Sequence, residues 1–223
     1  METRIEGELL PVVTCKLSKG ESVITENGGM SWMDEKIEMN TSTNGGIMKG
    51  LGRMLAGESL FMNIYTAKED GAEIAFASSF PGKILEFDLK DGETIIAQKQ
   101  AFLCSEKTVD LAMHFRKKLG AGFFGGEGFI MQKLSGTGKV FLEVDGAVIK
   151  KELKEGEKLK VDNGYVVAMT ENVDLDIETV QGMKNIVFGG EGLFLTTLKG
   201  PGTVWLQSMP ISKLSSLLYV KPQ

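Results

Sequence analysis

The sequence predicts an all-β protein made of three similar β units in tandem, and three observations lead to that prediction. Short apolar stretches rich in β-branched and aromatic residues alternate with glycine turns along all 223 residues, which is typical of sandwiches and barrels rather than of βαβ units. A Leu-x-x-Gly-Glu motif occurs three times, at residues 17–21, 89–93 and 153–157. A Gly-Glu-(Gly/Ser)-(Leu/Phe) motif also occurs three times, at residues 57–60, 126–129 and 190–193.

The spacing of the two motifs divides the chain into units. The first motif begins 40, 37 and 37 residues before the second in the three copies, and successive copies of the first motif begin 72 and 64 residues apart. A period this long is typical of a small domain-like unit that was duplicated and fused, because solenoid repeats are shorter. We therefore expect three tandem β-sandwich units with a pseudo-threefold internal repeat, at residues 1–80, 81–144 and 145–223, packed as one compact unit with little helix.

Each Leu-x-x-Gly-Glu motif is predicted to form the turn of a hairpin or a strand corner. Apolar residues precede and follow it in every copy, as at residues 12–13 and 23–24 around the first one. Glycine suits a tight turn because it adopts positive φ without a steric cost. The predicted turn glycines are Gly20, Gly92 and Gly156.

The second motif opens a further hairpin in each unit. Gly-x-Gly turns at residues 136–138 and 200–202 separate β-branched and aromatic stretches in the second and third copies, and the first copy has a longer turn at residues 69–71. Glycine turns with such flanks are typical of hairpins. Helix is expected only as a turn or two near residues 44–55 and 211–218.

Composition excludes several classes of protein. Hydrophobic residues make up 42% and charged residues 25% of the chain, which is ordinary for a globular protein. The net charge of −5 argues against bulk binding of nucleic acid, which needs a basic surface. No apolar run reaches the roughly 18 residues of a membrane span, and no basic-then-apolar signal region opens the chain, so a cytoplasmic location with no membrane span is expected. Cys15 and Cys104 form no C-x-x-C motif, and we expect them to be reduced and buried.

Several motifs together resemble a known family. The Gly-Glu-Gly-(Phe/Leu) motif followed by Gly-x-Gly-x-Val, the Leu-x-x-Gly-Glu turns, and the segment Gly-Gly-Met-Ser-Trp-Met at residues 28–33 resemble the altered-inheritance-of-mitochondria (mitochondrial biogenesis) family, long catalogued in bacteria as a domain of unknown function. The resemblance covers residues 2–219. It implies β-sandwich units with a fold like that of the tryptophan RNA-binding attenuation protein, three to a chain, and a ring-like homo-oligomer such as a trimer. It implies no reaction and no catalytic residues. RNA or tryptophan binding does not carry over, because no matching ligand motif is present and a shared fold does not establish function.

A literal G-x-G-x-x-G occurs at residues 120–125. This motif indicates dinucleotide binding only where a strand precedes it and a helix begins inside it. Another Gly-Glu-Gly follows at once, which a helix start would not tolerate, and the other two copies lack the spacing. We interpret the segment as a connector.

Basic residues precede the second motif in each copy. Glycines and cations together can receive phosphate groups, whereas lysines on a loop or edge strand also discourage edge-to-edge pairing. Both interpretations stay open, and a surface where these residues cluster is the predicted site for a ligand or partner. The residues are Lys49, Arg53, Arg116, Lys117, Lys118 and Lys184.

Neither the recurring glutamates nor the histidine indicates catalysis. Glu58, Glu127 and Glu191 occupy the same place in each copy, which favours a structural role such as accepting backbone N–H bonds in a turn. His114 is the only histidine and lies in no zinc-ligand pattern. We therefore predict no catalytic residues, no metal and no cofactor.

Two hypotheses of function follow. In the first, the chain is a non-enzymatic binding or scaffolding protein that acts as a homo-oligomer. Twelve methionines favour adaptable interfaces, and tandem sandwich units leave edges that a symmetric ring would cover. In the second, the chain binds a small molecule or a nucleic acid through the basic loops between repeats, and has at most weak enzymatic activity.

Overall fold

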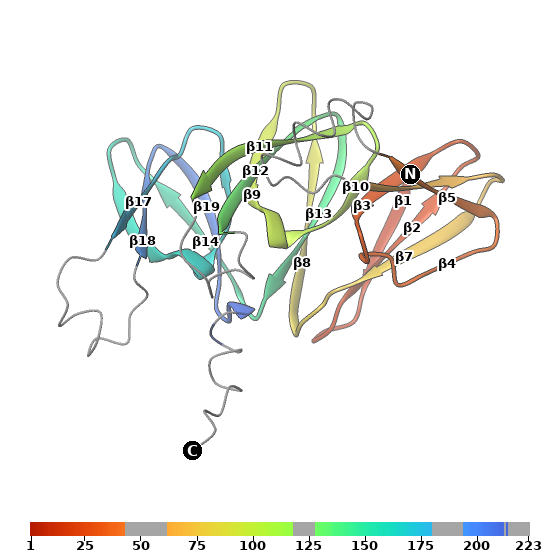
Figure 1. Ribbon diagram of the computed structural model, residues 1–223, viewed down its shortest axis with the longest axis horizontal. Helices are drawn as coiled ribbons and strands as arrows, with labels where there is room; N and C mark the ends of the chain where they lie inside the picture. The colour runs from red at the N-terminus through yellow and green to blue at the C-terminus, as the bar shows by residue number, and fades with distance from the viewer. Residues whose placement is uncertain (43–61, 118–127, 180–193, 212, 214–223) are drawn as a thin grey trace, which may run out of the picture.

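The computed structural model (Figure 1) describes residues 1–42, 62–117, 128–179, 194–211 and 213. Nearly all regular structure in these ranges is β-strand, which confirms the predicted all-β class. The strands are β1 (Glu2–Glu6), β2 (Val12–Leu17), β3 (Ser22–Glu26), β4 (Trp32–Met33), β5 (Ile37–Ser42), β6 (Met62–Ala67), β7 (Ala72–Ala77), β8 (Gly82–Leu89), β9 (Thr94–Gln98), β10 (Phe102–Glu106), β11 (Val109–Lys117), β12 (Phe129–Gly136), β13 (Gly138–Asp145), β14 (Val148–Leu153), β15 (Lys158–Asp162), β16 (Val166–Thr170), β17 (Asp174–Thr179), β18 (Phe194–Lys199) and β19 (Gly202–Gln207).

Helix is scarce, as the sequence predicts. The described residues contain the 3-10 turns η1 (Lys99–Ala101) and η3 (Asn163–Tyr165) and helical backbone at Ile211. The expected helical segment at residues 44–55 lies outside the described residues. No helix in the described ranges is long and apolar enough to cross a membrane.

The strands form four antiparallel sheets, which follow one another along the long axis of the molecule (Figure 1). In strand order they are sheet 1 (β1-β2-β7-β4), sheet 2 (β5-β6-β3-β10-β13-β8), sheet 3 (β11-β12-β9-β16-β19-β14) and sheet 4 (β15-β18-β17). Sheet 1 lies at the right end of Figure 1 and sheet 4 at the left end.

The order of strands recurs from sheet to sheet. The triplets β5-β6-β3, β11-β12-β9 and β17-β18-β15 follow one pattern with a step of six strands, and the triplets β4-β7-β2, β10-β13-β8 and β16-β19-β14 follow another. Sheets 2 and 3 each contain one triplet of each pattern, joined by the pairs β3–β10 and β9–β16. These pairs join strands on either side of the expected boundaries after residues 80 and 144, so sheets 2 and 3 each contain strands from two neighbouring units.

Three apolar cores separate the four sheets. Successive residues of a strand point to opposite faces, so Val23 of β3 packs in the first core and Ile24 in the second. In the same way Ile95 of β9 packs in the second core and Ile96 in the third. Sheets 2 and 3 are therefore covered on both faces, which explains why their central strands are apolar throughout rather than alternating.

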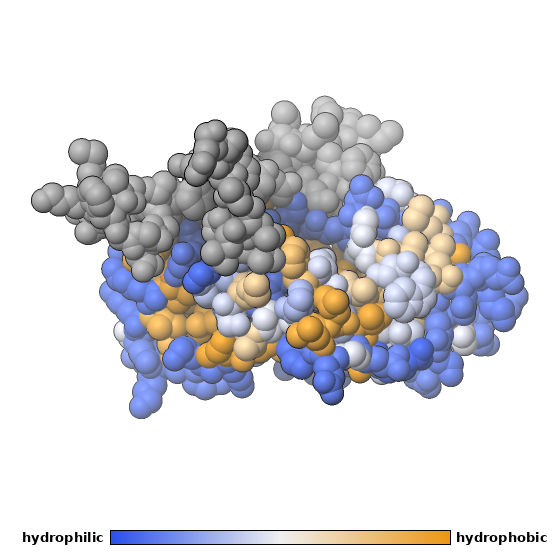
Figure 2. Space-filling view, turned by 90° about the horizontal axis from the view of Figure 1, so that it is seen from below, coloured by the Kyte–Doolittle hydropathy of each residue, from blue (hydrophilic) through white to orange (hydrophobic). Residues whose placement is uncertain are grey.

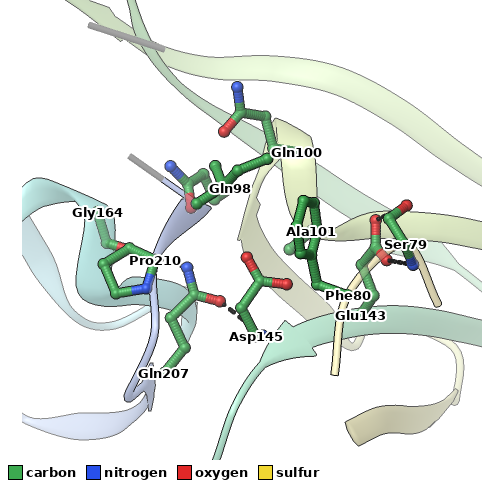
Figure 3. A pocket seen from close by; sticks show the side chains of 11 residues that line it. Ser79, Phe80, Gln98, Gln100, Ala101, Glu143, Asp145, Gly164, Gln207 and Pro210 are labelled. Carbon is green, nitrogen blue, oxygen red and sulfur yellow. Dashed lines mark hydrogen bonds between the residues drawn. The ribbon is translucent and has the colours of Figure 1, made fainter. Parts of the chain in front are cut away.

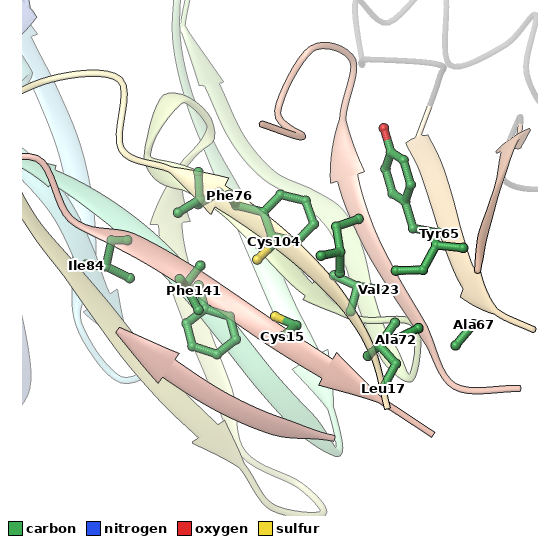
Figure 4. Packing of buried hydrophobic residues seen from close by; sticks show 14 residues of the cluster. Cys15, Leu17, Val23, Tyr65, Ala67, Ala72, Phe76, Ile84, Cys104 and Phe141 are labelled. Carbon is green, nitrogen blue, oxygen red and sulfur yellow. The ribbon is translucent and has the colours of Figure 1, made fainter. Parts of the chain in front are cut away.

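The first core also holds both cysteines. Figure 4 shows Cys15 and Cys104 between the strands, close to Phe76 and Phe141. Both are free, buried thiols, as expected from the sequence. Burial raises the pKa of Cys104 well above its ordinary value, and the neighbouring Cys15 raises it further.

The Leu-x-x-Gly-Glu motifs form three turns with the same hydrogen bonds. Gly20, Gly92 and Gly156 have φ of 87°, 83° and 73°, which is the left-handed region that favours glycine. The carboxylate of the next residue accepts a hydrogen bond from the backbone N–H three positions earlier, at 2.7, 2.9 and 2.9 Å for Glu21, Glu93 and Glu157. The motif therefore combines a glycine that makes the turn with a glutamate that closes it.

The prediction of hairpins at the Gly-x-Gly segments is wrong. The segment at residues 136–138 joins β12 of sheet 3 to β13 of sheet 2, and the segment at residues 200–202 joins β18 of sheet 4 to β19 of sheet 3. The longer turn at residues 69–71 likewise joins β6 of sheet 2 to β7 of sheet 1. These turns are corners at which the chain passes from one sheet to the next, because the strands on their two sides pair with other strands.

Candidate assembly interface

The structure describes only two of the predicted basic surface residues. Arg116 and Lys117 lie near the end of β11, which is an edge strand of sheet 3. Outside the described residues lie Lys49, Arg53, Lys118, Lys184, Glu58, Glu127 and Glu191. His114 lies on β11 and is exposed.

The two joints inside the chain have one common register. At the β3–β10 joint Ser105 lies opposite Ile24, and at the β9–β16 joint Met169 lies opposite Ile96. Ser105 and Met169 are each the fourth residue of their strand, and Ile24 and Ile96 are each the third. Within the β3–β10 joint the N–H of Lys107 donates to the carbonyl of Ser22 at 3.1 Å.

Two strands correspond to the strands of these joints but have an unpaired edge within the described part of the chain. The strand β15 stands where β3 and β9 stand in their triplets, and it pairs with β18 alone. The strand β4 stands where β10 and β16 stand, and it pairs with β7 alone. Met33 lies opposite the third residue of β7, just as Ser105 and Met169 lie opposite the third residues of β13 and β19.

The open edges lie at opposite ends of the molecule. Figure 1 places β18 at the end formed by sheet 4 and β4 at the end formed by sheet 1. The strands β15 and β4 therefore cannot pair within one chain. An edge strand with unpaired backbone groups is a template for pairing with another chain.

Burial distinguishes the β4 edge from the two closed joints. Cys104 and Ala168 precede Ser105 and Met169, and all four side chains are fully buried. At the corresponding places of β4, Trp32 is 57% exposed and Met33 is 37% exposed. Trp32 and Met33 are thus large apolar side chains that stay exposed at the place where their counterparts are buried.

The β15 edge is more polar than its counterparts. Lys158 and Lys160 are exposed, and Leu159 and Val161 are half-buried against the third core. Lys160 Nζ donates to Glu178 Oε2 at 3.0 Å, and this bond holds the pKa of Glu178 below its ordinary value. Lys160 is the third residue of β15, as Ile24 and Ile96 are of β3 and β9. If the two edges paired in the common register, Met33 would lie opposite Lys160, and two positions further along Glu35 would lie opposite Lys158. The two edges would then have opposite charges at that position.

Sequence reasoning expected edges that a symmetric ring would cover, but it did not identify which strands form them, although a signal was present. It sought a site among basic loop residues, whereas the open edges become visible only when strand neighbours are known. The available signal was the lysine–leucine alternation at residues 158–160, where the other two units have the apolar pairs at 23–24 and 95–96.

The fold defines a class of all-β protein in which antiparallel sheets pack face to face in series through apolar cores. The family follows from comparison with known proteins. The family model described as Mitochondrial biogenesis AIM24 matches residues 3–209, and the chain belongs to this family. It is 31% identical over 217 residues to an uncharacterised protein of Streptococcus pyogenes serotype M6, which covers 93% of this chain and 85% of the relative. A crystal structure of a Streptococcus pyogenes protein matches with a TM-score of 0.79 and 27% identity, over 97% of each chain.

Proposed function

We propose that the chain is a non-enzymatic, cytoplasmic scaffolding or binding protein that works as a head-to-tail homo-oligomer. In this proposal each chain is three tandem units of the tryptophan RNA-binding attenuation protein type. The edge of β15 in one copy pairs with the edge of β4 in the next. The observation that carries the proposal is the exposure of Trp32 and Met33 at the place where both internal joints are buried.

Completion of a sheet supports the pairing. Sheet 4 is a triplet of the first pattern, and sheet 1 is a triplet of the second pattern extended by β1. Joined through β15 and β4 of two copies, they would form one sheet with the strand order of sheets 2 and 3. The same register would place Trp32 beside Val161, whose side chain packs half-buried at the third core, so both would lose contact with water.

The contact is heterologous because it joins two different edges. Such contacts form a closed ring where the rotation between copies closes, and a filament where it does not. A ring of three chains is the size implied by the family resemblance. It would leave no open β15 or β4 edge, which is how closed β assemblies avoid aggregation.

The test uses multi-angle light scattering at micromolar concentration on the full chain and on Lys160→Pro. The register of the β3–β10 joint, with Lys107 bonded to Ser22, implies that alternate residues of β15 direct their N–H groups away from β18, Lys160 among them. Proline at this position removes an outward donor and leaves the pairing with β18 intact. We expect a discrete oligomer for the wild type and a monomer for Lys160→Pro.

The matched control is Lys160→Thr, which removes the charge and the bond to Glu178 but keeps the N–H. It should assemble like the wild type, and circular dichroism should show that both variants are folded. A monomeric wild type would overturn the proposal. Assembly of Lys160→Pro to the size of the wild type would show that this edge is not the contact.

A further inference from the structure

A pocket of about 350 Å³ lies where sheets 2 and 3 meet. Residues from five parts of the chain line it: the segment after β7, the end of β9 with η1, the end of β13, η3, and the end of β19 with the residues that follow. Its volume is at the small end of the range of roughly 300–1,000 Å³ that is typical of small-molecule sites. Apolar residues form part of the wall, among them Phe80 and Ile211.

Two carboxyl groups belong to this pocket, from Glu143 and Asp145. In Figure 3 Glu143 lies beside Ser79, and the Asp145 carboxylate is directed toward the side where Gln98 and Gln100 lie. Burial raises the pKa of both carboxyl groups. Neither has an ion-pair partner within the described residues, and no lysine or arginine lines the pocket.

The charge of Glu143 is not needed for its hydrogen bond to the backbone. Glu143 Oε2 accepts from the N–H of Ser79 at 2.7 Å. At the corresponding place of the next joint, Gln207 Oε1 accepts from the N–H of Asp145 at 3.0 Å. A neutral amide performs the same structural task there, so this hydrogen bond does not require a carboxyl group at residue 143.

Gln98 gives an independent indication of a ligand. Its side chain is only 4% exposed, lines the pocket, and has no hydrogen bond to any residue in the described ranges. The amide of Gln98 is therefore open to the pocket and available for a hydrogen bond with a molecule inside it.

We infer that this pocket binds a small organic cation, a primary or secondary ammonium with a short apolar body. The ammonium lies between the carboxylates of Glu143 and Asp145, a polar group of the ligand pairs with Gln98, and the apolar body contacts Phe80 and Ile211. This site is distinct from the β15 and β4 edges and does not depend on assembly. It also differs from the basic surface predicted from the sequence, since its charges are acidic.

The experiment is isothermal titration calorimetry of the full chain with cyclohexylamine, benzylamine, ethanolamine and putrescine at neutral pH. Cyclohexanol and cyclohexanecarboxylate are the neutral and anionic controls, and calcium chloride tests for a metal ion. We expect at least one ammonium to bind, and cyclohexanol and cyclohexanecarboxylate not to bind. Binding of calcium alone, equal binding of the three cyclohexyl compounds, or no heat from any ammonium up to about 10 mM would overturn the inference.

Variants locate the site. Asp145→Asn and Glu143→Gln keep the acceptor oxygens and should each weaken ammonium binding about tenfold or more. Gln98→Leu should weaken it without lowering the melting temperature, since the amide has no hydrogen-bond partner among the described residues. Asp110→Asn removes an exposed carboxylate on β11 and should bind like the wild type. Unchanged affinity in both Asp145→Asn and Glu143→Gln would place the ligand elsewhere and overturn the assignment.

Discussion

Replacement of Gly92 by alanine is expected to destabilise the protein by about 1–2 kcal/mol, which is the cost of holding an L-residue in the left-handed region. Gly92 has φ of 83°, and a Cβ built there meets no heavy atom within 4 Å. Steric overlap therefore adds nothing to the cost. Gly20 and Gly156 also have positive φ and an open Cβ position, so alanine should cost the same free energy in all three turns.

Urea unfolding followed by circular dichroism measures this cost, and in thermal melts it corresponds to a decrease of about 2–8 °C in Tm. Gly92→Asn is the matched control, because asparagine tolerates positive φ and should recover part of the loss. Gly82→Ala gives a contrasting case, since its Cβ would lie 1.8 Å from the carbonyl oxygen of Val144. An unchanged stability of Gly92→Ala, or an equal loss for alanine and asparagine, would refute the reasoning.

Three further predictions concern stability and reactivity. Glu143→Gln should raise Tm at neutral pH. Burial, and to a lesser extent Asp145, raises the pKa of Glu143 above its ordinary value of 4.5, so the native state binds the proton more tightly and its stability falls as pH rises from that value through the folded pKa. The gain should vanish below pH 4.5, and a pH-independent difference in melting scans would contradict this. Glu157→Ala should cost about 1 kcal/mol by removing the bond that closes its turn, whereas Glu157→Gln should lose less; equal losses in urea titrations would show that this bond does not stabilise the turn. Cys15 and Cys104 should react with iodoacetamide only when the protein unfolds, and mass spectrometry showing rapid labelling of the native protein would disprove their burial.

The fold class could be predicted because its signals are local. Glycine at a turn and β-branched residues beside it report the conformation of their own segment, so the turns at Gly20, Gly92 and Gly156 were identified from the motif alone. The role of the glutamate in that motif was not identified. It depends on which backbone N–H lies within reach of the carboxylate, and that geometry becomes visible only in the folded turn.

The arrangement of strands could not be predicted in the same way. Similar motifs show that a segment recurs, but they do not show whether its strands pair within one unit or with the next. The pairs β3–β10 and β9–β16 join strands from opposite sides of the expected boundaries, and the residues that line the pocket likewise come from both sides of these boundaries. Ser79, Gln98, Glu143 and Gln207 are far apart in the chain, and none of them belongs to a recognisable motif.

Sheets 2 and 3 are each built from strands of two stretches of the chain, which has a consequence for how the chain is synthesised and how it can be divided. Sheet 2 is complete only once β13 has been synthesised, and sheet 3 only once β19 has been synthesised, so neither of these two sheets is contained in one third of the polypeptide. A fragment cut after residue 144 would present the β9 edge that β16 normally occupies, and the remaining fragment would present β16. The two pieces should therefore find each other when mixed. By the same logic, an added unit would bring one edge like that of β15 and one edge like that of β4. Evolution could therefore lengthen such a chain without changing any existing strand pair.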